Sequence, residues 1–156
     1  MTTEIEKESL NFHKIFVPKA FNHYYLYSNI LLLSQDRHYF DEVVIGIDPG
    51  KTTGFAVLAD KSIILGSAEF YTAVDTVKEV ISVFFNIETS NIVVKVGQGG
   101  GETKDEIVKR LNEIFHGKIL IEVVNEDYTS KKKTLDFGLN HSKNIHSAIL
   151  IALRNS

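Results

Sequence analysis

The sequence predicts an α/β domain built on a five-stranded mixed sheet, and three observations lead to this fold class. The chain has 156 residues, a usual length for one domain. From residue 43 onward, apolar segments with a strand-like pattern and segments with a helical period follow one another. Their order is three strands, a helix, a strand, a helix, a strand, a long loop and a last helix. Three consecutive strands favour an antiparallel meander, and strands that return through a helix run parallel to the first.

The predicted strands are apolar runs rich in β-branched residues, and they span 43–47, 54–58, 62–70, 92–96 and 118–124. The first is apolar throughout, as expected for a strand buried on both faces. A turn at Asp60-Lys61 separates the second strand from the third. The fourth ends in the glycine-rich loop Gly97–Gly101, in which a backbone can approach closely. These strands place the sheet within a domain that spans 43–156.

Helical spacing predicts three helices on the faces of this sheet, over 72–85, 102–115 and 142–154. The second has acidic residues in its first turn and Gly117 after its end. Ser142 is the expected N-cap of the last. Residues 1–42 form an N-terminal extension, predicted helical over "FNHYYLYSNILLLS". Its aromatic residues suit packing on the core or on a second subunit, and a clamp that touches a substrate is the alternative.

The composition excludes several classes of protein. Apolar residues make up 44% and charged residues 24%, enough for an ordinary core. No apolar run approaches the length of a membrane span. The polar, acidic start "MTTEIEKES" is unlike a signal peptide, so a cytoplasmic location is expected. Without cysteine the chain has no disulfide and no thiolate metal site. A net charge of -3 argues against coating nucleic acid by bulk charge but allows local basic patches.

The stretch "GIDPGKTTGFAVLAD" resembles the end of a phosphate-binding P-loop at Gly50-Lys51-Thr52. A P-loop needs four residues between its two glycines and a helix after it. Here only three residues separate Gly46 from Gly50, and the segment that follows reads as a strand. The stretch is therefore predicted to be a hairpin, and Asp48 becomes the candidate functional residue.

Four stretches together resemble the ribonuclease H-like nucleases. They are "VIGIDPGKTTGFAVL", "IVVKVGQGGG", "EVVNEDYTS" and "KNIHSAILIALR", in that order. They are most similar to the RuvC and YqgF branch, which covers Holliday-junction resolvases and nucleases that process precursor ribosomal RNA. The similarity spans roughly residues 43–154. It implies a ribonuclease H-like fold and a nuclease acting on a DNA junction or a structured RNA.

The resemblance also implies a site for Mg²⁺ or Mn²⁺. In such a site two ions stabilise the attacking water and the leaving oxygen of a phosphodiester. Asp48 takes the place of the family's first metal ligand, Glu126 of its second, and His146 stands where an aspartate is usual. The alternatives are an Asp48 that caps the Pro49 turn, a solvated Glu126, and a hydrogen-bonded core histidine at His146. As placed in the predicted helix, the His146 ring points at the sheet.

The basic residues are the candidates for substrate binding. They are Lys51, Lys131, Lys132, Lys133 and Lys143. A rim of lysines beside an acidic, metal-loaded centre suits a phosphate backbone. A lysine run is also a common feature of solvated loops. Lys143 occupies a position that is acidic in the resolvases, and Gly97-Gln98 replaces their glutamate, which suits the YqgF branch better.

Two other functions remain open at this point. The Asp48-x-Gly50-x-Thr52 pattern also resembles the first phosphate-binding hairpin of actin-like proteins and sugar kinases, which need two such domains. A catalytically inactive nucleic-acid-binding or scaffold module with the same fold is the stronger alternative, favoured by Lys143 and His146. The sequence leaves a homodimer open.

Overall fold

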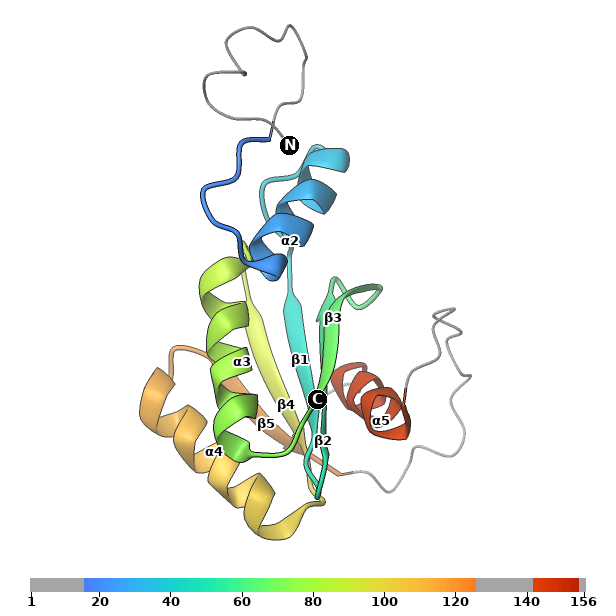
Figure 1. Ribbon diagram of the computed structural model, residues 1–156, viewed down its shortest axis with the longest axis vertical. Helices are drawn as coiled ribbons and strands as arrows, with labels where there is room; N and C mark the ends of the chain where they lie inside the picture. The colour runs from blue at the N-terminus through green and yellow to red at the C-terminus, as the bar shows by residue number, and fades with distance from the viewer. Residues whose placement is uncertain (1–15, 126–141, 155–156) are drawn as a thin grey trace, which may run out of the picture.

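The structure is a computed structural model that describes residues 16–125 and 142–154. Its centre is an open five-stranded sheet in the order β3-β2-β1-β4-β5 (Figure 1). The strands are β1 (Val43–Asp48), β2 (Thr53–Ala59), β3 (Ile63–Phe70), β4 (Ile92–Gly97) and β5 (Leu120–Val124). The helices are α2 (His23–Ser34), α3 (Ala73–Asn86), α4 (Gly101–Phe115) and α5 (Lys143–Ala152).

Strand pairing confirms the predicted mixed sheet. β1 pairs antiparallel with β2, and β2 pairs antiparallel with β3. On the other side, β4 lies parallel to β1 and β5 parallel to β4. The fold class is therefore α/β with an antiparallel meander at one edge and parallel strands at the other.

Local sequence explains where the elements begin and turn. The Thr72 side chain accepts a hydrogen bond from the Asp75 amide at 3.0 Å, which caps α3. Ser142 accepts from the Ile145 amide at 3.3 Å and so is the N-cap of α5, as predicted. Asp60 has φ 48° and Lys61 φ 57°, which makes the tight turn between β2 and β3 that the sequence predicted.

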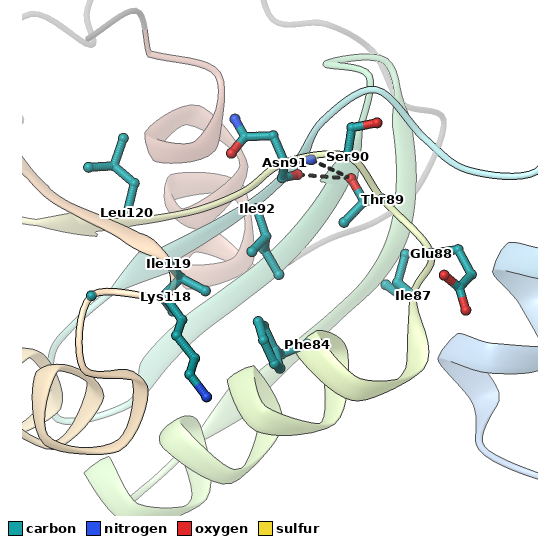
Figure 2. A pocket seen from close by; sticks show the side chains of 11 residues that line it. Phe84, Ile87, Glu88, Thr89, Ser90, Asn91, Ile92, Lys118, Ile119 and Leu120 are labelled. Atoms are coloured by element: carbon teal, nitrogen blue, oxygen red, sulfur yellow. Dashed lines mark hydrogen bonds between the residues drawn. The ribbon is translucent and has the colours of Figure 1, made fainter.

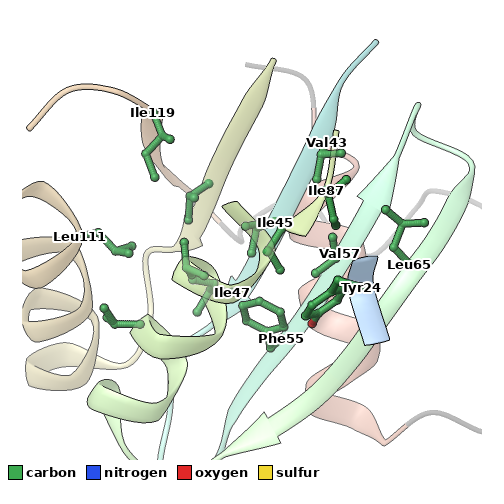
Figure 3. Packing of buried hydrophobic residues seen from close by; sticks show 14 of the residues in the cluster. Tyr24, Val43, Ile45, Ile47, Phe55, Val57, Leu65, Ile87, Leu111 and Ile119 are labelled. Carbon is green, nitrogen blue, oxygen red and sulfur yellow. The ribbon is translucent and has the colours of Figure 1, made fainter. Parts of the chain in front are cut away.

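Alternation along the strands divides the core into two layers. On one face, side chains such as Val43, Ile45 and Ile47 of β1 pack toward α3 and α4 (Figure 3). On the other face, Val44 packs with α5 residues such as Ala148. The helices therefore cover both faces of the sheet, with α5 alone on the second face among the helices described (Figure 1).

The N-terminal helix α2 belongs to the first layer. Tyr24 is only 1% exposed and lies in the same hydrophobic cluster as the strands (Figure 3). Its ring occupies the space over Gly66 of β3, and its hydroxyl donates to Glu79 Oε1 of α3 at 2.8 Å. Burial, reinforced by Glu79, raises the pKa of Tyr24 well above its usual value, so the phenol stays a proton donor.

The second layer depends on close backbone contact between α5 and the sheet. A Cβ added to Gly46 would lie 2.0 Å from the Ala148 carbonyl oxygen and 2.9 Å from the Ala152 Cβ. Gly46 therefore lets α5 approach β1 more closely than any other residue would permit.

Lys95 of β4 holds the carboxyl end of α5. Its side chain is 7% exposed, its ammonium donates to the Arg154 carbonyl, and Glu122 of β5 lies 3.8 Å away. A cation at this end of a helix also complements the helix dipole.

Across 16–125 and 142–154, none of the helices is both long enough and apolar enough to span a bilayer.

Candidate functional site

Asp48 is the last residue of β1, at the carboxyl end of the central strand. It is partly buried and pairs with Gly54 of β2. Because side chains alternate along a strand, Asp48 shares the α5 face with Val44 and Gly46. A buried, apolar strand thus ends in a carboxylate. It lies at the carboxyl ends of the strands, where open α/β sheets bind their ligands.

Glycines occupy the neighbouring strands at the level of Asp48. Gly54 is its partner on β2, and Ile47 pairs with Val96 on β4, which puts Gly97 beside Asp48 on the other side. Neither neighbour contributes a side chain. The Asp48 carboxylate is therefore the only side chain that these three strands project at that level of the α5 face.

The amino end of α5 fills the space over Gly54. A Cβ on Gly54 would lie 2.1 Å from the Asn144 carbonyl oxygen. The first turn of α5 is thus seated directly beside the strand position that pairs with Asp48. Gly54 is required here for the close approach of a helix backbone.

Glu69 of β3 continues the same row across the sheet, since it pairs with Gly54. Its Oε1 atom accepts hydrogen bonds from Ser142 Oγ at 2.7 Å and from Asn144 Nδ2 at 2.8 Å. With neighbouring strands about 4.8 Å apart, Glu69 and Asp48 begin about 10 Å from each other. Both of these hydrogen bonds join Glu69 to the amino end of α5, at Ser142 and Asn144.

The amino end of α4 approaches from the other side of the β1–β2 turn. Gly100 has φ 81°, and a Cβ there would lie 2.4 Å from the Pro49 carbonyl oxygen. The turn between Pro49 and Gly54 thus lies between the amino ends of two helices. Each of these ends carries partial positive charge, which favours anions nearby.

Several predicted site residues fall outside the residues that the structure describes. Glu126 and the lysines Lys131, Lys132 and Lys133 are among them. Val124, the last residue of β5, pairs with Gly97, the neighbour of Asp48. The chain therefore leaves the sheet two strands from Asp48, with Glu126 as the second residue beyond β5.

His146 occupies a different side of α5 from the one expected. The helix meets the sheet through Asn144, Ala148 and Ala152, which recur every four residues. At 3.6 residues per turn, His146 lies about 200° around the helix from Ala148, whereas Asn144 lies within about 40° of it. The expectation that the His146 ring points at the sheet was wrong, and Asn144 is the first-turn residue that faces it.

Two of the lysines predicted to bind substrate lie within the described residues, and both are exposed. Lys51 lies in the β1–β2 turn, and Lys143 is the first residue of α5. Both belong to the segments that surround Asp48, because the next residue after Lys143 covers Gly54. They suit the rim of a site for a phosphate backbone.

The described residues do not form a complete set of metal ligands. Within 16–125 and 142–154, no three His, Asp or Glu side chains are grouped closely enough to hold an ion. Among the described residues, Asp48 is the one expected metal ligand that lies at the carboxyl ends of the strands on the α5 face. A complete hard-cation site would need further oxygen ligands, and Glu126 is the candidate next in the chain.

A hollow of about 690 Å³ lies at the opposite end of the sheet (Figure 2). It is lined by the segments that lead into β4 and β5, including Asn91, Ile92, Lys118 and Leu120. Val43, at the other end of β1 from Asp48, pairs with Ile92. The hollow is therefore separate from the candidate site.

Sequence reasoning missed the contacts at the amino end of α5, in which Glu69 accepts from Ser142 and Asn144. The glycines of the strands were the available signal for this contact. Gly46 and Gly54 lie on the face that α5 covers, where they meet the backbone of Ala148 and Asn144. Comparison with models of known protein families and with curated proteins finds no match to this chain. The functional assignment therefore rests on the fold and on the surroundings of Asp48.

Proposed function

We propose that the protein is a divalent-metal-dependent nuclease that hydrolyses phosphodiester bonds in structured DNA or RNA. One observation carries the proposal, the position of Asp48. A partly buried carboxylate ends the central strand on the α5 face, between two glycines. Carboxylate oxygens are the ligands that hard divalent cations such as Mg²⁺ prefer, and this carboxylate lies where the ligands of open α/β sheets bind.

The surroundings of Asp48 support a phosphate-containing substrate. Lys51 and Lys143 are exposed on the segments next to it, and the amino ends of α4 and α5 flank the β1–β2 turn. Cationic side chains and helix amino ends are the usual contacts of phosphate oxygens. Together they make this edge of the sheet suited to a polyanion despite the net charge of -3.

In this proposal Asp48 and Glu126 hold Mg²⁺ or Mn²⁺, and His146 is a third ligand or positions a water. The ion would supply charge stabilisation for the attacking water and the leaving oxygen. His146 lies on the side of α5 away from Asn144 and Ala148, so it is the least supported of the three proposed ligands. Asp48 is the residue on which the proposal depends.

A non-catalytic nucleic-acid-binding module is the second candidate. It is favoured by the lack of a three-ligand group in the part of the chain that the structure describes. Such a module uses the same exposed lysines and helix ends to hold phosphates and needs no ion at Asp48. Binding without cleavage is its distinguishing property.

The first prediction compares wild type with Asp48→Asn, using Mn²⁺ or Mg²⁺ and a four-way DNA junction, a plain duplex and a structured RNA. We expect wild type to cleave one of these substrates and the variant to lose more than about 100-fold in rate, since loss of even the outer partners of a metal costs 10–100-fold. Calorimetry should show weaker Mn²⁺ binding by the variant.

Asp41→Asn is the matched control. Asp41 precedes the same strand at its other end, and its side chain is 83% exposed. This variant should cleave like wild type. Equal cleavage by wild type and Asp48→Asn would remove Asp48 from the mechanism. Retained binding with no cleavage by either protein would favour the non-catalytic module.

A further inference from the structure

The two ends of α5 are held to the sheet by different means. At the carboxyl end, the Lys95 ammonium, nearly buried, donates to the Arg154 carbonyl. At the amino end, the exposed carboxylate of Glu69 accepts from Ser142 and Asn144. The carboxyl end is therefore the firmer of the two, because charged contacts shielded from water are less weakened by solvent and salt.

A single oxygen of Glu69 organises the first turn of α5. Oε1 accepts from both Ser142 Oγ and Asn144 Nδ2, at 2.7 and 2.8 Å. Because the Ser142 hydroxyl donates its hydrogen bond to Glu69, the lone pairs of its oxygen remain for the Ile145 amide, 3.3 Å away. The carboxylate thus supports the N-cap as well as the side chain of Asn144.

The same turn lies beside Asp48. Asn144 carries the carbonyl that sits over Gly54, and Gly54 is the partner of Asp48 on β2. Any movement of the first turn away from β2 would uncover this position and shift Lys143, which precedes Asn144. The placement of the turn therefore decides what surrounds the Asp48 carboxylate.

We propose that Glu69 is a positioning residue for the Asp48 site, because it holds the amino end of α5 against β2. The effect of Glu69 on cleavage rests on the proposed nuclease function. Its contact with the amino end of α5 does not depend on that function. A carboxylate at a helix amino end also interacts favourably with the helix dipole. Without Glu69, the first turn retains its packing on Gly54 and the Ser142 cap, but the Ser142 and Asn144 side chains lose the acceptor that holds them to β3, and the turn frays more readily.

Amide hydrogen exchange on the full chain tests the hold directly. In Glu69→Ala, we expect the amides of Ile145, His146 and Ser147 to exchange about tenfold faster, as the loss of two hydrogen bonds to a charged group implies. Glu69→Gln keeps an oxygen acceptor and should restore slow exchange. Ser67→Ala, two residues earlier on the same face of β3, is the matched control and should leave these amides unchanged.

Kinetics with the same variants test the consequence for the reaction. With Mn²⁺ and the substrate that wild type cleaves best, Glu69→Ala should lower kcat/KM about tenfold, because the loosened turn shifts Lys143 and uncovers the strand position that pairs with Asp48. Glu69→Gln should stay within about twofold of wild type, since its oxygen accepts the same bonds. Rescue by glutamine separates positioning from a direct role of the Glu69 charge.

Unchanged exchange in Glu69→Ala would overturn the proposal, whatever the activity. Faster exchange with full activity would also overturn it, provided that Asp48→Asn abolishes cleavage in the same assay. If wild type cleaves none of the substrates, the nuclease function fails and exchange alone decides whether Glu69 holds α5. Equal loss of activity in the alanine and glutamine variants would assign Glu69 a charged role at the site and overturn positioning.

Discussion

At the scale of single residues, Gly46 shows how closely α5 depends on the absence of a side chain. A Cβ at this position would meet backbone atoms of α5, 2.0 Å from the Ala148 carbonyl oxygen. Neither a rotamer change nor a small side-chain movement relieves such a contact. The helix as a whole would have to move, together with the buried Ala148 and Ala152 that pack there.

We therefore predict that Gly46→Ala destabilises the protein by about 1–3 kcal/mol, the usual cost of overpacking a core. Urea unfolding followed by circular dichroism measures this change. Gly50→Ala is the control, because a Cβ at Gly50 would make only an ordinary contact, 3.5 Å from the Thr52 carbonyl oxygen. Its effect should stay within about 0.5 kcal/mol. Equal stability of the two variants would contradict the close approach of α5 at Gly46.

The sequence allowed Asp48 to be singled out because a carboxylate at the end of an apolar strand conflicts with burial. It did not allow the face of Glu69 to be assigned. The pairing of β2 with β3 shifts in register between Val57 and Leu58, so faces cannot be counted across these strands from sequence spacing. His146 was misplaced for a related reason, since the phase of α5 is set by contacts with Gly46 and Gly54.

At the scale of elements, Tyr24 joins helix α2 to the domain through both packing and a hydrogen bond. Tyr24 is 1% exposed, and its hydroxyl donates to Glu79 Oε1 of α3. Its aromatic ring packs over Gly66 of β3. The packing role of this aromatic residue follows from its burial, whereas Phe21 on the same segment is 86% exposed and contributes little to the core.

We predict that Tyr24→Phe keeps the ring packing but weakens the attachment of α2, with a loss of about 1–2 kcal/mol for a hydrogen bond to a charged acceptor. Tyr27→Phe is the matched control on the same helix, because Tyr27 is 45% exposed. Thermal unfolding of both variants gives the comparison. A loss in Tyr27→Phe as large as in Tyr24→Phe would show that the Glu79 contact is not the cause.

Element boundaries followed from sequence wherever a local signal set them. The cap at Ser142 and the turn at Asp60-Lys61 depend on neighbours in the chain, and both were found where expected. The contacts of α2 could not be predicted in this way. They depend on a glycine in β3 and a carboxylate in α3, which lie 42 and 55 residues from Tyr24.

At the scale of the whole molecule, one carboxylate ties the segment before β1 to the turn after β2. Asp60 accepts hydrogen bonds from the Asp41 and Glu42 amides at 2.9 and 3.1 Å, and its other oxygen accepts from the Arg37 guanidinium. These contacts join α2, β1 and the meander at one end of the sheet. Because a small domain unfolds as a unit, their loss lowers the stability of the whole.

The charge of Asp60 makes this junction sensitive to acid. Burial opposes its ionisation, but the hydrogen bond from Arg37 and the two amides outweigh burial and hold the pKa of Asp60 below its usual value of 3.8. A carboxyl with a lowered pKa in the folded state stabilises the fold above its unfolded pKa. That stabilisation is lost as the pH falls through the folded pKa.

We therefore predict that Asp60→Asn is less stable than wild type at pH 7 and that the difference shrinks below about pH 4, where the unfolded carboxyl becomes protonated. Urea unfolding of both proteins at pH 7, 5 and 3 gives the three differences. Asp41→Asn changes the outer, exposed partner of Arg37 and should match wild type at each pH, since exposed ion pairs contribute little. A difference for Asp60→Asn that stays constant from pH 7 to pH 3 would mean that the geometry of the side chain, and not its charge, holds the junction together.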